Sequence, residues 1–135
     1  MNVAEIMTKR VFSVTPTTKV KELAALLRDK KIGGVPVIEE GKLAGIVTGA
    51  DILTRKPGQN LVRNIMTTNV VTVTDSTRVR EAARIVANKR ITRLPVLSQG
   101  KVVGVVSAAD IVKAVARSPK EPARAVGASR AGGAH

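Results

Sequence analysis

The chemical groups that most enzymes and metal sites use are nearly absent from this chain. Its 135 residues include no Cys, no Trp and no Tyr, one Phe (Phe12) and one His (His135). Without Cys there can be no disulfide and no thiolate ligand. With His only at the last position, a Ser or Thr nucleophile has no conventional base and a transition metal has no conventional ligands. We therefore expect neither catalysis nor a metal site.

Long apolar runs and targeting signals are also lacking. No apolar run approaches the roughly 18 residues that suggest a membrane helix, and Met1–Glu5 lacks the basic and apolar regions of a signal peptide. There is no P-loop, and the glycine pairs Gly33-Gly34 and Gly132-Gly133 fit no dinucleotide fingerprint. The simplest interpretation is a cytoplasmic protein without membrane contact.

What the chain does have is positive charge and a sufficient apolar content. The net charge is +13 and 44% of the residues are hydrophobic, which is ample for a folded core. The charge favours anionic partners such as phosphates, nucleic acid or an acidic protein. Because Phe12 is the only aromatic residue, there is no stacking platform for single strands, and nucleic-acid binding would rest on weak, salt-sensitive phosphate contacts.

The sequence repeats itself once. Residues 62–112 align with residues 3–53 at a constant offset and without a gap, so that Ile6-Met7-Thr8 matches Ile65-Met66-Thr67 and Ala50-Asp51-Ile52 matches Ala109-Asp110-Ile111. Two copies are too few for a solenoid. They indicate a pseudo-twofold pair packed face to face, which presents the cleft between its halves twice.

Periodicity and turn residues predict the same β-α-β-β-α order in each copy. The first copy has a strand at Val11–Thr15, a helix with Thr18 as N-cap, a hairpin of Val35–Ile38 and Leu43–Val47, and a helix from Gly49. The second copy repeats this order with an N-cap at Thr77, a hairpin of Leu94–Leu97 and Val102–Val106, and a helix from Ala108. The expected fold is α/β (α+β), with two repeats packed through their sheets. The expected divisions are repeat 1 (1–56), a linker (57–61), repeat 2 (62–116) and a flexible basic tail (117–135).

One polar motif recurs where each hairpin turns into the following helix. It reads Gly-x-x-Thr/Ser-x-x-Asp, at Gly45–Asp51 and at Gly104–Asp110. Such a Thr/Ser and Asp pair forms a capping box. It also gathers a hydroxyl, a carboxylate that can accept both hydrogens of a ribose diol, and free N–H groups that can hold a phosphate. From the spacing alone, a bare cap and a ligand site both remain open.

These motifs together resemble those of CBS domains. The resemblance includes Ile32–Val37 and Ile91–Val96, the two Ile-Met-Thr segments, and Val14-Thr15-Pro16 with its counterpart Val73-Thr74-Asp75, and it covers about residues 3–115. Tandem pairs of this kind, called Bateman modules, are similar to the regulatory parts of cystathionine β-synthase, IMP dehydrogenase and AMP-activated protein kinase. The resemblance implies two halves with packed sheets and adenine nucleotides in the clefts between them.

The resemblance further implies crossed sites, each built from both copies. In one cleft the adenine would be lined by Thr15, Val20 and Ile32-Gly33-Gly34, and the ribose held by Ser107 and Asp110. In the other cleft the corresponding residues are Thr74, Val79, Ile91, Thr92 and Arg93, facing Thr48 and Asp51. Pro36 and Pro95, from the Pro-Val steps, complete the predicted set.

The two predicted clefts differ in charge. Thr92 and Arg93 stand where CBS relatives often have basic residues that contact phosphate, whereas the first copy has Gly33 and Gly34 there. This difference argues against equal occupancy. Which cleft Arg93 faces, and whether it is only a surface arginine, remains open at this point.

The predicted function is therefore a stand-alone regulatory module, not an enzyme, that senses an adenine nucleotide. The expected ligand is AMP, with ADP, ATP, an adenosyl compound such as S-adenosylmethionine, or a dinucleotide as alternatives, and no cofactor is obligate. The expected partners are an unidentified effector protein and a second copy, since the last helices carry more apolar positions than one internal face needs: Ile52, Leu53, Ile111, Val112 and Val115. The alternative is a basic nucleic-acid-binding protein on the CBS fold.

Overall fold

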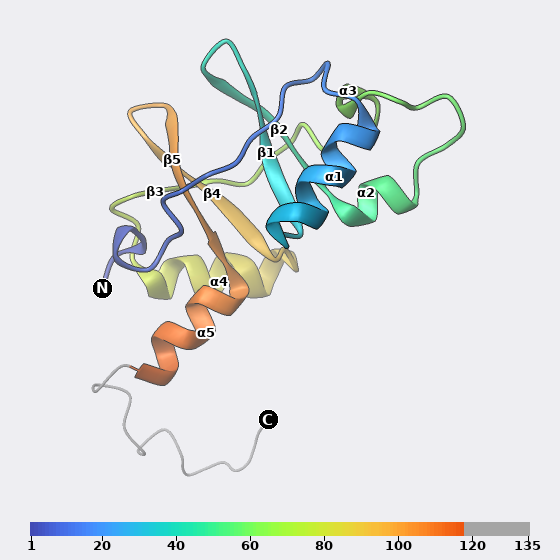
Figure 1. Ribbon diagram of the computed structural model, residues 1–135. Coiled ribbons are helices and arrows are strands. Elements are labelled where there is room, and N and C mark those ends of the chain that lie inside the picture. The colour runs from blue at the N-terminus through green and yellow to red at the C-terminus, as the bar shows by residue number, and fades with distance from the viewer. Residues whose placement is uncertain (118–135) are drawn as a thin grey trace.

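The computed structural model describes residues 1–117, so the basic tail expected at 117–135 lies, apart from Arg117, outside the described residues. The first copy contains η1 (Val3–Glu5), α1 (Val20–Lys30), β1 (Gly34–Glu39), β2 (Lys42–Thr48) and α2 (Gly49–Leu53). The second contains α3 (Val62–Ile65), β3 (Val73–Thr74), α4 (Val79–Lys89), β4 (Arg93–Ser98), β5 (Lys101–Ser107) and α5 (Ala108–Arg117). Figure 1 shows the two hairpins in the middle of the molecule, with α1 and α2 at one side and α4 and α5 at the other.

The mixture of helices and strands confirms the expected α+β fold class. Both hairpins form as the turn residues predict. The tips are Glu40-Gly41 and Gln99-Gly100, with φ of 51° and 80° in the first and 52° and 81° in the second. Two successive positive φ angles are characteristic of the type I′ turn, whose twist matches that of the paired strands. The register then places Gly34 opposite Thr48 and Arg93 opposite Ser107. The N-terminal ends of β1 and β4 are thereby brought next to the capping residues.

The first predicted strand of each copy is much shorter than expected. In place of a strand over Val11–Thr15, a single parallel bridge joins Val14 to Val37, and its counterpart β3 has two residues. The chain turns away at this point because the backbone N–H of Thr15 donates to Thr18 Oγ1 (3.0 Å).

Thr18 is therefore not the N-cap of the first helix, contrary to prediction. Helix α1 begins at Val20 after Lys19, and the backbone N–H of Lys19 donates to Glu22 Oε1 (3.0 Å). The hydroxyl of Thr77 likewise accepts from the backbone N–H of Thr74 (3.0 Å), and α4 begins at Val79. In both copies the threonine stabilises the turn before the helix instead of the helix itself.

The leading segment of each copy packs into the half built mainly from the other copy. Val3 is fully buried in the cluster that contains Leu94, Val96 and Val106, and Val62 is fully buried in the cluster that contains Val37. Backbone hydrogen bonds join Thr8 with Val105 (2.9 and 3.0 Å) and Thr67 with Ile46 (2.9 Å in both directions). Figure 1 accordingly shows the N-terminal segment beside β3 and α4, away from α1. The sequence repeats and the structural halves thus do not coincide.

Glycine allows these crossing segments to approach the hairpins. A Cβ at Gly45 would lie 2.7 Å from the carbonyl oxygen of Thr67, and a Cβ at Gly104 would lie 3.0 Å from that of Thr8. The first glycine of the recurring Gly-x-x-Thr/Ser-x-x-Asp motif is therefore needed for packing between the copies. Within residues 1–117, no helix has the length and apolar character needed to cross a membrane.

We expect Gly45→Ala to lower the free energy of unfolding by about 1–3 kcal/mol, because its new methyl group would press on a backbone carbonyl that cannot turn aside. Gly49→Ala is the matched control, since the nearest atom to a Cβ there is 4.0 Å away. Losing a glycine from a compatible position should leave stability unchanged or raise it. Urea unfolding of both variants measures the difference, and equal stabilities would contradict the role assigned to Gly45.

Candidate functional site

The polar motif forms a capping box in both copies, which confirms the cap interpretation. The backbone N–H of Thr48 donates to Asp51 Oδ2 (2.8 Å), and that of Asp51 donates to Thr48 Oγ1 (3.4 Å). The backbone N–H of Ser107 donates to Asp110 Oδ2 (2.9 Å), and that of Asp110 donates to Ser107 Oγ (3.1 Å). The cap and the hairpin register together fix both acids at the ends of β2 and β5.

The cap uses only part of each carboxylate. In both boxes Oδ2 accepts the capping bond, and no residue within 1–117 donates to Oδ1 of Asp51 or Asp110. Both aspartates are half-buried. A carboxylate oxygen can accept more than one hydrogen bond, so the capping role leaves acceptor capacity for a ligand.

A cavity of about 270 Å³ joins the two copies at the second of these boxes. It is lined by the start of β1, by the extended segment before Val14, and by the capping end of β5, as follows: Thr8, Arg10, Val11, Phe12, Ile32, Gly33, Gly34, Val35, Pro36, Arg93, Val105, Ser107 and Asp110. The structure therefore brings Ile32-Gly33-Gly34 and Pro36 of the first copy together with Ser107 and Asp110 of the second, as the crossed arrangement required.

Two residues expected in this cleft lie elsewhere. Thr15 is exposed, with its hydroxyl 3.2 Å from those of Thr17 and Thr18. Val20 lies in the first turn of α1 and lines a different groove on the helical side of the first half. The turn at Thr15–Thr18 directs the chain to α1 and away from the start of β1, which explains both positions.

The counterparts in the second copy are placed in the same way. Thr74 is exposed and its hydroxyl lies 3.2 Å from those of Ser76 and Thr77, and Val79 is part of the second core. Ile91 and Thr92 directly precede β4 and Pro95 lies within it, whereas Thr48 ends β2 and Asp51 lies in the first turn of α2. None of these seven residues lines the 270 Å³ cavity.

The segment Thr8–Phe12 was missed as part of the site. It is held at one end by the hydrogen bonds of Thr8 to Val105 and at the other by the bridge of Val14 to Val37. Phe12 is half-buried, with the Arg10 guanidinium 5.8 Å and the Lys30 ammonium 5.0 Å from its ring centroid. The one available signal was a lone aromatic residue shortly after an Ile-Met-Thr motif.

Arg93 reaches from β4 across to the first copy. A Cβ on Gly33 would collide with Arg93 Nη2, and one on Gly34 would lie 3.4 Å from Nη1. The two glycines thus leave room for the guanidinium, and Arg93 lines the cavity that contains Ser107 and Asp110. The family resemblance grouped Arg93 with Thr48 and Asp51, but the sequence left open which cleft it faces, because a sequence does not show in which direction a long side chain points.

The cavity therefore combines three kinds of group. Apolar walls come from Val11, Phe12, Ile32, Val35 and Pro36, the acceptor is Asp110, and the cations are Arg10 and Arg93. The ion pairs found within residues 1–117 are Arg28–Asp29 and Arg84–Glu81, so neither cation of the cavity is neutralised by a described acid. No group of three or more potential His, Cys, Asp or Glu metal ligands occurs in the described part of the chain.

Comparison with known proteins identifies the fold. The CBS domain pattern matches residues 3–58 and 62–117. The CBS domain-containing protein YhcV of Bacillus subtilis is 32% identical over 115 residues, which cover 82% of each chain. Inosine-5'-monophosphate dehydrogenase of Korarchaeum cryptofilum is 40% identical over 102 residues, covering 75% of this chain but 21% of the enzyme. The similarity to that enzyme thus concerns only a small part of it.

Solved structures agree with this. CBSX2, a CBS-pair protein of Arabidopsis thaliana, in complex with AMP has a TM-score of 0.79 and 32% identity over 85% of this chain and 96% of its own. The CBS domain pair of protein MJ0100, in complex with 5'-methylthioadenosine and S-adenosyl-L-methionine, has a TM-score of 0.79 and 29% identity over 84% and 94%. The chain belongs to the CBS domain family, as two CBS domains in tandem.

Proposed function

We propose that this CBS pair binds an adenosyl ligand, with AMP as the expected one, in the cavity between its two halves. The observation that carries the proposal is the single cavity in which Ile32-Gly33-Gly34 of one copy meets Ser107 and Asp110 of the other. The complexes of CBSX2 with AMP and of MJ0100 with two adenosyl compounds support the same ligand class.

The base, the ribose and the phosphate of such a ligand could each contact a different group of residues in the cavity. The flat base would lie against Val11, Phe12 and Ile32, which are among the apolar residues that line the cavity. The ribose diol would donate to the free oxygen of Asp110, because a carboxylate accepts two hydroxyl hydrogens readily. A phosphate, or the carboxylate of an adenosyl amino acid, would approach Arg93 and Arg10.

Binding would act on the arrangement of the halves. The cavity is walled by the segment Thr8–Phe12, which is anchored in one half through Thr8 and in the other through Val14. A ligand that contacts this segment and both copies can favour one arrangement by its difference in affinity between arrangements. We propose a regulatory, energy-sensing role of this kind in place of catalysis.

The output would pass to other molecules. The exposed apolar residues Val112 (67% exposed) and Val115 (49%) lie on α5, and we propose this face as the contact of a homodimer. An effector protein would bind one arrangement of the two halves more tightly than the other.

The alternative function, nucleic-acid binding, has one observation in its favour. Arg78, Arg80 and Arg84 gather with Glu81 at the start of α4 around a cavity of about 370 Å³. Binding of this kind would depend on phosphate charge and fall steeply with salt. It would not require the Asp110 carboxylate.

The first test is calorimetry with AMP, ADP, ATP, S-adenosylmethionine and adenosine. We expect saturable heat for at least AMP, and a rise in thermal stability with AMP, since a ligand at 100 times its dissociation constant adds about 2.7 kcal/mol. Baseline heats for all five compounds at millimolar concentration would rule out the proposed function.

The second test separates ligand binding from helix capping. Asp110→Ala and Asp51→Ala each remove one box and should each cost about 1 kcal/mol of stability. Only Asp110→Ala should also weaken AMP binding in this cavity, by about tenfold or more, because it removes a charged acceptor worth about 1.5–3 kcal/mol. If both variants melt earlier and bind AMP like the wild type, the boxes serve as caps alone.

The third test concerns Arg93. Arg93→Ala should weaken AMP by about tenfold or more, because one charge-assisted contact to phosphate is worth about 1.5–3 kcal/mol. Adenosine, which has no phosphate, should bind nearly as well as before. Lys101→Ala removes an equal charge from an exposed position at the start of β5 and should change neither affinity. An equal loss for AMP and adenosine would show that Arg93 does not contact the phosphate.

A further inference from the structure

The cavity between the halves carries more positive than negative charge. Of the described residues that line it, Arg10 and Arg93 are cationic and Asp110 is the one acid. A third cation stands beside its wall, because the Lys30 ammonium lies 5.0 Å from the centroid of the Phe12 ring. The ion pairs found in the described part of the chain involve none of these three cations. Their charge is therefore available to a ligand.

Arg93 lies close to the carboxylate that would hold a ribose. Its backbone is paired with that of Ser107, the residue that forms the capping box with Asp110. Its guanidinium extends to the first copy, where a Cβ on Gly33 would collide with Nη2. A ribose bound to Asp110 would therefore have this guanidinium nearby, and a group on its 5′ carbon would meet positive charge.

Arg10 reaches the same cavity from the segment that joins the halves. Thr8, two residues earlier, exchanges backbone hydrogen bonds with Val105 (2.9 and 3.0 Å). Phe12, two residues later, has the Arg10 guanidinium 5.8 Å from its ring centroid, a distance at which a cation and an aromatic ring attract each other. Lys9 lies between Thr8 and Arg10 in the sequence but does not line the cavity. The segment thus presents Arg10 to a ligand, and not its charged neighbour.

The other capping box has no such cations at the corresponding positions. The repeat offset pairs Asp110 with Asp51, Arg10 with Asn69, and Arg93 with Gly34. The acid is thus present in both copies, whereas each cation has an uncharged counterpart. The two cations are therefore a feature of this one cavity and are not required by the fold.

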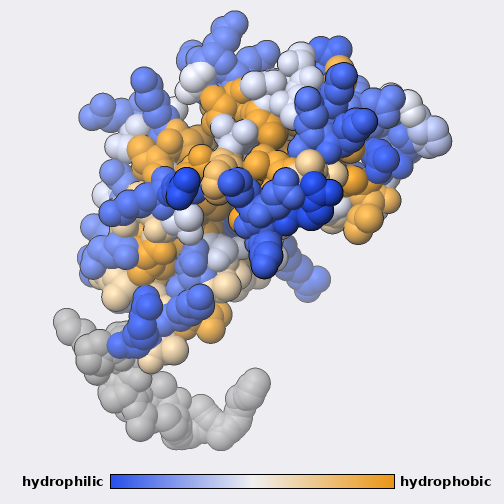
Figure 2. All heavy atoms as spheres, in the orientation of Figure 1, coloured by the Kyte–Doolittle hydropathy of each residue, from blue (hydrophilic) through white to orange (hydrophobic). Residues whose placement is uncertain are grey.

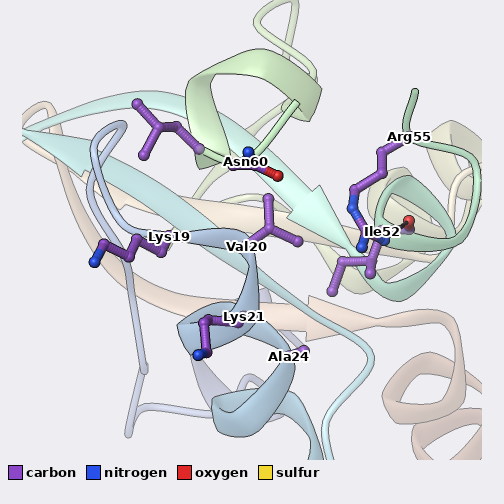
Figure 3. Close-up of a pocket in the computed structure, with 8 residues that line it drawn as sticks. Lys19, Val20, Lys21, Ala24, Ile52, Arg55 and Asn60 are labelled. Carbon is purple, nitrogen blue, oxygen red and sulfur yellow. Dashed lines mark hydrogen bonds between the residues drawn. The ribbon is translucent and has the colours of Figure 1, made fainter. Parts of the chain in front are cut away.

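Cations without this arrangement occur in a groove beside the short helix α2. This groove has a volume of about 400 Å³, and its charged lining residues are Lys19, Lys21 and Arg55. The side chains of Lys19 and Lys21 point away from Arg55 (Figure 3), and no described acid lines the groove. The chain carries a net charge of +13, and hydrophilic side chains are spread over the visible face (Figure 2). A cation alone therefore does not mark a site, whereas two cations beside a carboxylate acceptor fit a charged nucleoside.

We propose that the cavity between the halves selects adenosyl ligands that carry a 5′-phosphate, and that Arg10 sets this specificity together with Arg93. This inference rests on the proposed function. A phosphate monoester carries a charge of about −1.5 to −2 at pH 7, and guanidinium groups bind it through charge-assisted hydrogen bonds. The 5′ substituent of 5′-methylthioadenosine is uncharged. In S-adenosylmethionine a positively charged sulfonium is bonded to the same carbon, and like charges brought together oppose binding.

Calorimetry with AMP, 5′-methylthioadenosine and S-adenosylmethionine tests the order of affinity. We expect AMP to bind tightest and 5′-methylthioadenosine to bind about tenfold or more weakly than AMP, because it lacks the charge-assisted contacts. S-adenosylmethionine should bind weakest. If either other compound binds as tightly as AMP, the proposed selectivity is wrong while adenosyl binding stands. If none of the three binds, the proposed function falls and this inference falls with it.

A charge reversal tests the role of Arg10. Arg10→Glu changes an exposed side chain and should weaken AMP by about tenfold or more, leave 5′-methylthioadenosine nearly unchanged and bring S-adenosylmethionine closer to AMP. Lys9→Glu is the matched control, because it changes the net charge equally at the neighbouring exposed position that does not line the cavity. This control should leave all three affinities nearly unchanged.

Three results with these variants would overturn the role of Arg10. Equal losses of AMP affinity in Arg10→Glu and Lys9→Glu would mean that the phosphate responds to overall charge. Equal losses of AMP and 5′-methylthioadenosine in Arg10→Glu would mean that Arg10 supports the shape of the cavity and does not recognise phosphate. Unchanged AMP affinity in Arg10→Glu would mean that the side chain does not contact the ligand. Binding of 5′-methylthioadenosine as in the wild type shows that a variant is folded.

Discussion

The exchange of leading segments between the copies is the interaction on which the rest of this structure depends. Val3 completes the core of the second half and Val62 completes that of the first, and both are fully buried. Burying one valine side chain is worth about 1.5–3 kcal/mol, so separating the halves would expose apolar surface on both sides. Hydrogen bonds of Thr8 to Val105 and of Thr67 to Ile46 fix the crossing. The exchange therefore fixes the position of the cavity between the halves. One wall of this cavity is the segment Thr8–Phe12, which follows the exchanged N-terminal segment.

The same few residues fold the chain and form the candidate site. Gly45 and Gly104 admit the crossing segments, and three residues later Thr48 and Ser107 cap the next helices with Asp51 and Asp110. The cap orients each carboxylate through Oδ2 while its other oxygen accepts nothing from a described residue. A ligand can thus use a side chain whose position is already determined by folding, and little ordering of that side chain is left for the binding step.

The two copies differ in structure at two places, the start of the first hairpin strand and the length of the last helix. Gly33 and Gly34 leave space that Arg93 of the other copy fills, so the cation belongs to the cavity of Asp110. The shortened α2 leaves a groove that α5 closes in the second half. A pseudo-symmetric scaffold consequently presents one distinct charged cavity and one distinct helical groove.

Local chemistry in the sequence was enough to determine the hairpins, the helices after them, both capping boxes and the repeat. Apart from the repeat, which is visible as a constant offset along the chain, each depends on residues a few positions apart, such as Glu40-Gly41 in a type I′ turn or Ser107 with Asp110. Ile32–Gly34 and Asp110, which the family motifs grouped together, line one cavity. Only the tertiary structure decided that Val3 and Val62 exchange cores, that Thr15 and Val20 lie outside the cavity, and that Arg93 crosses to Gly33. These features depend on the direction of a turn, on the path of a segment or on the reach of a long side chain between elements distant in sequence, and no local spacing encodes that placement.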